Sequence, residues 1–143
     1  MRIFLWICAM FVCHVSFSQD PDNRATLLPQ IVDEPPRAPG CATVETALVL
    51  TCTQNSLDSF VRGKFNTALF RGINLNEKRI RTYSVFTITE TGAIESISVR
   101  TSHPVLTKEM ERVLALLPRF LPAKHEGIPV AVQYVLPIIF TLG

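Results

Sequence analysis

The chain has 143 residues, of which 48% are hydrophobic and 18% are charged, and its formal net charge at pH 7 is +2. This length corresponds to one domain, and so small an excess of positive charge excludes the strongly basic surface by which proteins bind nucleic acid. The apolar content, with nine phenylalanines, excludes an intrinsically disordered chain, so a globular domain is expected.

The first segment, residues 1–18, is typical of a secretory signal peptide. Arg2 is a short positive start, residues 3–15 are apolar apart from His14, and Ser16 and Ser18 are small residues before a cleavage site. The alternative is an uncleaved membrane anchor, but the apolar stretch is shorter than the roughly 20 residues that a membrane-spanning helix needs. We expect cleavage after Ser18 and export of the remaining chain.

Residues 19–40 indicate a linker, because they contain five of the ten prolines and show no hydrophobic period. An extended, partly polyproline II conformation is expected for this segment. The sequence thus predicts three parts, which are a signal peptide at 1–18, a proline-rich linker at 19–40 and a folded domain at 41–143.

Two cysteines, Cys41 and Cys52, remain once the signal peptide is removed. In an oxidising compartment we expect them to form a disulfide. A metal or redox site is the alternative, but the spacing is not C-x-x-C, and His103 and His125 are far away in sequence. The pair is therefore interpreted as a structural crosslink.

The folded domain begins with a helical pattern and continues as a β-hairpin. Apolar residues at helical spacing behind the capping candidates Asn55 and Ser56 predict a helix over about 55–67, and residues 68–78 predict a loop. Two strands are predicted at 79–89 and 93–100, joined by a tight turn that contains a glycine. The first strand places Ile80, Phe86 and Ile88 on one face, with Tyr83 and Val85 on the other.

A second helix and a third strand complete the predicted domain. The helix is predicted over about 105–117, ended by Pro118, from apolar residues at helical spacing, namely Val105, Leu106, Met110, Val113, Leu114 and Leu117. Residues 128–142 have the strongest strand pattern in the chain, with strict alternation of apolar residues. The residues on the apolar face are Val130, Val132, Tyr134, Leu136, Ile138, Phe140 and Leu142.

These elements predict an α+β fold, in which two helices pack on a three-stranded antiparallel sheet of strand order 2-1-3. The last strand is then an edge, which agrees with its prolines, because proline lacks the N–H of the ladder. The even separation of Pro129 and Pro137 points both missing N–H groups to the free side. Between them, Ala131, Gln133 and Val135 are expected to present unpaired backbone groups, and such an edge either aggregates or is used.

Three stretches of this domain resemble the TonB carboxy-terminal domain family. They are FTITETGAIESISVRTS at 86–102, LPRFLPA at 117–123 and GIPVAVQYVLPIIFTL at 127–142, in family-like order and spacing. The resemblance covers about 79–142, and the PGC sequence at 39–41 with the first helix is similar to a longer version with paired cysteines. The family's fold is two helices on a three-stranded antiparallel sheet.

The resemblance implies a periplasmic domain of a Gram-negative bacterium that docks outer-membrane receptors importing iron chelates (siderophores), vitamin B12 or glycans. Family members bind a short extended receptor segment by β-augmentation at the last strand. No cofactor is implied. Carried onto this sequence, the partner-binding residues are Val130, Ala131, Val132, Gln133, Tyr134, Val135 and Leu136.

The amino-terminal segment departs from the pattern of the full-length transducer. The family's anchor carries a serine and a histidine one helical turn apart, whereas Met10 stands four residues before His14 here. The usual aromatic–proline pair after the first helix is also missing. With a cleaved signal the protein is a soluble TonB-like binding domain, whereas an uncleaved anchor would allow ExbB and ExbD as partners at the inner membrane.

An enzyme and a structural homodimer are the contrasting classes. No catalytic residue set or metal-ligand cluster is found, since His103 is interpreted as a turn residue and His125 as a loop residue. A homodimer would pair two copies of the last strand through their edges. Its role would be structural or regulatory, without energy transduction.

Overall fold

The computed structural model describes residues 27–73 and 78–142. The predicted signal peptide and the first part of the linker lie outside the described residues. The elements follow in the order α1 (Thr46–Lys64), the 3-10 helix η1 (Thr67–Gly72), β1 (Arg79–Ile88), β2 (Ile94–Arg100), α2 (Pro104–Ala115), β3 (Ala123–His125), β4 (Ile128–Val130) and β5 (Val132–Thr141).

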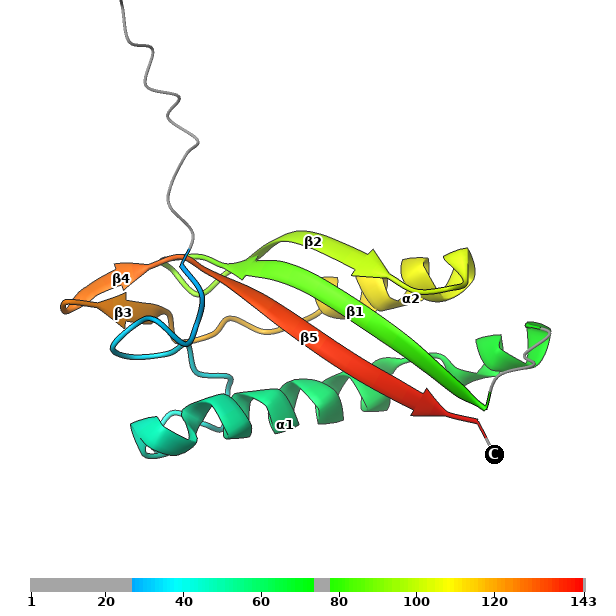
Figure 1. Ribbon diagram of the computed structural model, residues 1–143, viewed down its shortest axis with the longest axis horizontal. Helices are drawn as coiled ribbons and strands as arrows, with labels where there is room; N and C mark the ends of the chain where they lie inside the picture. The colour runs from blue at the N-terminus through cyan, green and yellow to red at the C-terminus, as the bar shows by residue number, and fades with distance from the viewer. Residues whose placement is uncertain (1–26, 74–77, 143) are drawn as a thin grey trace, which may run out of the picture.

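The sheet has the predicted strand order. Its three strands are arranged β2-β1-β5, and β1 is antiparallel to both neighbours. Figure 1 shows β1 in the middle, with α1 running along the β5 side of the sheet and α2 along the β2 side. This is the predicted α+β architecture, with β5 at one edge.

Alternation along β1 and β5 places one face of the sheet against both helices. The buried residues of β1 begin at Ile80 and recur at every second position to Ile88, and those of β5 recur from Val132 to Phe140. They form one core with apolar residues of the helices, among them Leu57 and Met110. The predicted inward faces of the first and last strands are therefore confirmed from Ile80 to Ile88 and from Val132 to Phe140, whereas Val130 and Leu142 lie outside β5.

Helix α1 starts earlier than predicted. It begins at Thr46, so the proposed caps Asn55 and Ser56 lie inside it, and it ends at Lys64. The residues that extend it are Val49 and Thr53, which continue the buried four-residue spacing of Leu57 and Val61 toward the amino terminus. A buried threonine at a core position hid this part of the pattern.

The disulfide joins Cys52 within α1 to Cys41 before it, with a Cα–Cα distance of 6.0 Å. The predicted pairing is therefore present. It ties the chain that enters α1 to that helix, with Cys41 buried in the core.

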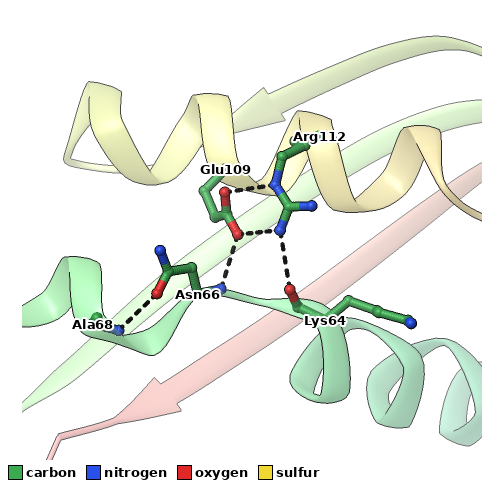
Figure 2. A network of polar contacts seen from close by, with 5 residues as sticks. All are labelled: Lys64, Asn66, Ala68, Glu109 and Arg112. Atoms are coloured by element: carbon green, nitrogen blue, oxygen red, sulfur yellow. Dashed lines mark hydrogen bonds and ion pairs between the residues drawn. The ribbon is translucent and has the colours of Figure 1, made fainter.

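An ion pair within α2, between the buried Glu109 and the half-exposed Arg112, bonds to the backbone at the end of α1 (Figure 2). Arg112 donates from Nη2 to the Glu109 carboxylate at 2.6 Å and to the Lys64 carbonyl oxygen at 3.1 Å. The same carboxylate accepts the backbone N–H of Asn66 at 2.8 Å. Arg112 and Glu109 thus hold the end of α1 against α2.

Two further predictions need correction. The segment expected as a loop contains η1, whose start is capped by the Asn66 side chain accepting the Ala68 N–H. Val105, assigned to the apolar face of the second helix, is exposed near the start of α2 because the buried face begins at Leu106.

The strand predicted over 128–142 is divided into two. β4 pairs with β3 in a separate two-stranded sheet, in which Ala123 faces Val130, and β5 alone joins the main sheet. The tight turn between β3 and β4 contains Gly127, whose φ is 77°. Residues 128–130 pair with β3, the segment just before them in the chain, so the apolar alternation over 128–142 extends across two different strands.

The described part of the predicted linker packs against the domain instead of extending from it. Glu34 and Arg37 form isolated β-bridges with Lys124 and Leu121, and Ala38 is part of the core. Residues 27–40 thus run from the start of β5 along the β3–β4 hairpin toward α1 (Figure 1). Their prolines fit this path, because an isolated bridge uses few backbone N–H groups.

Candidate functional site

The candidate site is the side of β5 that faces away from β1. Leu142 donates its backbone N–H to the Lys78 carbonyl oxygen, which lies opposite it, at 2.8 Å. In an antiparallel pair, residues whose backbone groups bond to the neighbouring strand alternate with residues whose backbone groups point away from it. Since the pairing runs without a shift from Arg79–Thr141 to Ile88–Val132, even-numbered residues of β5 bond to β1. The backbone groups of Gln133, Val135, Pro137, Ile139 and Thr141 face outward, and we call this row the open edge.

Proline occupies the open edge without disturbing the sheet. Pro137 lies opposite Tyr83, at a position whose N–H would point away from β1. Pro129, in contrast, lies in β4 opposite Lys124 and does not belong to this edge. The prediction that both prolines lie on the free side of the last strand is therefore right for Pro137 and wrong for Pro129.

The chain itself covers the first position of the open edge. Leu27 forms a parallel bridge opposite Val132, donating its N–H to the Ala131 carbonyl oxygen at 3.2 Å and accepting the Gln133 N–H at 2.8 Å. The expectation that Ala131 and Gln133 present unpaired groups is thus wrong for the Ala131 carbonyl and the Gln133 N–H. Their partner is Leu27, in the segment that was predicted to be a linker.

Pro29 limits this internal pairing to one bridge. The next bond of a parallel ladder would need an N–H two residues after Leu27, and proline has none. The chain turns there, with the Ile31 N–H bonded to the Leu28 carbonyl oxygen at 3.1 Å. Beyond this turn the backbone groups of Val135 have no partner among residues 27–73 and 78–142.

An arginine covers the other end of the open edge. Arg62 on α1 donates from Nη2 to the Ile139 carbonyl oxygen at 3.0 Å. Asp58, one turn earlier, accepts from Arg62 Nε at 2.7 Å and holds the guanidinium in place, 5.5 Å from the ring centroid of Phe140. The uncovered part of the edge therefore runs from the Gln133 carbonyl to the Ile139 N–H.

The seven predicted binding residues occupy different environments. Val130 ends β4 and Ala131 joins it to β5. The side chains of Val132, Tyr134 and Leu136 are buried on the helix side, whereas those of Gln133 and Val135 are exposed. Of these seven residues, only Gln133 and Val135 thus combine an exposed side chain with outward backbone groups.

Tyr134 lies where the edge meets α1. Its hydroxyl donates to Gln54 Oε1 at 3.4 Å, and its ring stacks on Phe86 with centroids 5.6 Å apart. Burial raises the pKa of Tyr134 to about 12, so the phenol is neutral at physiological pH. A cavity of about 530 Å³ opens beside it.

Sequence reasoning missed four residues that shape the edge, namely Leu27, Pro29, Gln54 and Arg62. Leu27 and Pro29 stand in a proline-rich segment that was interpreted as a linker, although the pair Leu27–Leu28 is an apolar signal within it. Gln54 precedes the predicted start of the first helix. Arg62 bonds a backbone carbonyl distant in sequence, and no local pattern reveals such a contact.

The histidines and carboxylates do not assemble a reactive centre in the described parts of the chain. His103 accepts the N–H groups of Leu106 and Thr107 through its backbone carbonyl at the start of α2. His125, predicted in a loop, lies in β3. Residues 27–73 and 78–142 hold no group of three or more His, Cys, Asp and Glu side chains placed to bind a metal ion.

Comparison with known families gives one match. Residues 82–142, from β1 to the end of β5, match the Gram-negative bacterial TonB protein C-terminal family. No curated protein matches the chain. None of the helices in residues 27–73 and 78–142 has the length and apolar character to cross a membrane.

The matched region contains the hairpin, α2 and the whole open edge. Together with α1, which precedes it, this region has the fold that the resemblance implied, two helices on a three-stranded antiparallel sheet. Domains of this family are non-enzymatic and lie in the periplasm of Gram-negative bacteria. Residues 82–142 form a TonB C-terminal domain and belong to that family.

Proposed function

We propose that this protein docks outer-membrane TonB-dependent receptors, by adding an extended receptor segment to the open edge of β5, in the uptake of siderophores, vitamin B12 or glycans. Membership of the TonB C-terminal family implies a TonB-like role in energy transduction. The docking mode, the receptor and the cargo are the parts that we propose. The site comprises the backbone of Gln133 and Val135, with Val130, Ala131, Val132, Tyr134 and Leu136 flanking or supporting it.

One observation carries the proposal, namely that the uncovered part of the edge lies between two covered ends. Leu27 occupies the first position and Arg62 the Ile139 carbonyl. The distance from Gln133 to Ile139 is about 20 Å at ~3.3 Å per residue, which suits a docked strand of six or seven residues. Val135, in the middle, offers both an N–H and a C=O.

Replacing Val135 by proline tests this docking mode. The Val135 N–H faces outward, so the change removes a donor from the edge and no bond to β1. Pro137, two residues on, shows that the sheet tolerates proline at such a position. We expect binding of peptides from the periplasmic amino termini of TonB-dependent receptors to weaken about ten-fold or more, measured by fluorescence anisotropy.

Thr141→Pro is the matched control, because Thr141 also faces outward but lies beyond the carbonyl that Arg62 covers. It should leave peptide affinity unchanged. Equal affinities for the wild type and both variants, with circular dichroism showing a native fold, would contradict docking at this edge.

A homodimer through the same edge is the second candidate. The side chains of Val135 and Ile139 are 50% and 41% exposed, which leaves apolar surface along the edge. Sedimentation velocity distinguishes the two functions. A tight dimer that Val135→Pro converts to monomers and that ignores receptor peptides would replace receptor docking as the function.

The state of the amino terminus decides how the domain would act. A mature chain beginning at Gln19 would be a soluble periplasmic binding protein, whereas one beginning at Met1 would be an anchored transducer with ExbB and ExbD as partners. Amino-terminal sequencing of the protein from a Gram-negative host separates these alternatives.

A further inference from the structure

The cavity beside Tyr134 has three walls. Residues 28–30 form one, the stretch of α1 from Leu50 to Asn55 forms the second, and Gln133 to Val135 on β5 forms the third. Its volume of about 530 Å³ is within the range of pockets that hold small ligands, roughly 300–1,000 Å³. It therefore adjoins the uncovered part of the open edge.

Leu27 indicates which residue of a docked strand would face this cavity. Leu27 lies opposite Val132, and its side chain packs against the core on the helix side of the sheet. Side chains of a strand alternate, so a docked residue opposite Tyr134 would point to the same side. It would bond to the Gln133 carbonyl and the Val135 N–H and enter the cavity in front of α1.

The walls of the cavity are uncharged and combine apolar side chains, those of Leu28, Pro29, Leu50 and Val135, with hydrogen-bonding groups. They carry the amides of Gln30, Gln54, Asn55 and Gln133 and the hydroxyl of Thr51, and none of the lining residues is Asp, Glu, Lys, Arg or His. The Gln54 carbonyl accepts the Tyr134 hydroxyl, and its NH2 group has no partner in residues 27–73 and 78–142.

The hydrogen-bonding groups of the walls favour one chemical class of side chain in the cavity. A charged side chain placed here would lose water without gaining an opposite charge, which is costly. A purely apolar side chain would leave amide groups unpaired where it excludes water, which also costs free energy. An amide or hydroxyl side chain can exchange hydrogen bonds with the walls and avoids both costs.

We propose that this cavity is a specificity subsite for the docked segment, and that it takes an uncharged, hydrogen-bonding side chain, Asn, Gln, Ser or Thr, opposite Tyr134. This inference rests on the proposed function, since a strand on the open edge must first bring the side chain there. The subsite adds side-chain selectivity to an edge whose backbone contacts are independent of sequence.

The test uses the full chain and seven-residue peptides selected from a random phage-displayed library for binding that Val135→Pro abolishes. Each position of a selected peptide is then changed to Gln, Leu, Lys or Glu, and the dissociation constant is measured by fluorescence anisotropy. We expect one position at which Lys and Glu weaken binding about ten-fold or more relative to Gln.

Two variants of Gln54 assign that position to the cavity. Gln54→Leu removes the amide at similar volume and should erase the preference for Gln over Leu at this position. Gln54→Glu adds a negative charge and should make Lys the preferred side chain there. Ser59→Leu is the matched control, since Ser59 is an exposed residue of α1 that does not line this cavity, and it should preserve the wild-type preference.

The outcomes separate the two proposals. If no library peptide depends on Val135, the proposed docking function fails and the subsite fails with it. If Val135-dependent peptides bind but accept Lys and Glu as well as Gln at every position, the subsite is overturned while edge docking stands. A preference that neither Gln54 variant alters also overturns the subsite.

Discussion

The carbonyl oxygen of Leu27 accepts the backbone N–H of Gln133 at 2.8 Å, so the chain completes the first step of a parallel strand on its own open edge. The second bond of the bridge, from the Leu27 N–H to Ala131, is 3.2 Å long. The bridge therefore sets where a docked segment can begin.

Leu27→Pro should loosen this bridge, because proline has no N–H to give to Ala131. A lost backbone hydrogen bond costs about 0.5–1.5 kcal/mol, so the Gln133 amide should exchange with solvent roughly two- to ten-fold faster. Hydrogen exchange followed by NMR measures this. Leu28→Pro is the control, since the Leu28 N–H takes no part in the bridge. Unchanged exchange at Gln133 in the Leu27 variant would contradict the pairing.

The ion pair of Figure 2 should make stability depend on pH. The hydrogen bond from Arg112 is the main cause that lowers the pKa of Glu109 below its usual 4.5, with the Asn66 N–H adding to it against the opposing effect of burial. A lowered pKa stabilises the fold above the unfolded-state value of about 4.3, and the contribution is lost as pH falls through the lower, folded value.

Glu109→Gln should therefore reduce the free energy of unfolding by about 1–3 kcal/mol at pH 7, measured by urea denaturation. The difference from wild type should shrink below about pH 4, where the carboxylate of the wild type becomes protonated. Glu111→Gln, at an exposed position of α2, should change stability by less than ~0.5 kcal/mol. A deficit of Glu109→Gln that is constant from pH 7 to pH 3 would argue against the charged contact.

Gly92 is the glycine that the fold least tolerates changing. Its φ is 83°, and a Cβ built on it would lie 1.8 Å from the Phe120 carbonyl oxygen, while its own carbonyl accepts the Phe120 N–H at 2.9 Å. Gly92→Ala should cost roughly 3 kcal/mol in thermal or urea unfolding. Gly127→Ala has a similar φ of 77° with nothing within 4 Å, so only the backbone cost of about 1 kcal/mol is expected. Equal losses would refute the steric contact.

Tyr134 should ionise unusually late. The chain has two tyrosines, so Tyr83→Phe leaves Tyr134 as the sole phenol in an absorbance titration. Burial raises the pKa of Tyr134 to about 12, and the midpoint should fall there while circular dichroism stays native. Because the unfolded chain ionises first, at about pH 10, stability should be full below pH 10 and decline as pH rises toward 12. A native protein with a midpoint near 10 would disprove the burial.

The sheet and its inward face follow from local patterns in the residue order. Alternation in β1 and β5 specified which residues are buried, the turn at Gly92 specified the hairpin, and one returning helix left strand order 2-1-3 as the natural topology. These features depend on residues that are close in sequence. The spacing of apolar residues within a segment indicates whether it is a helix or a strand and which of its faces is buried. Pro137 likewise marked the outward side of the last strand.

How much of that edge is uncovered depends on contacts between distant parts of the chain. Leu27 reaches β5 from a proline-rich segment, Arg62 reaches Ile139 from α1, and Gln54 meets Tyr134 across the helix–sheet boundary. Each contact joins residues far apart in the chain. The identity of a residue does not indicate which distant group will bond to its backbone carbonyl. The edge was readable from local periodicity, whereas its limits and its neighbouring cavity depend on where distant segments fold back.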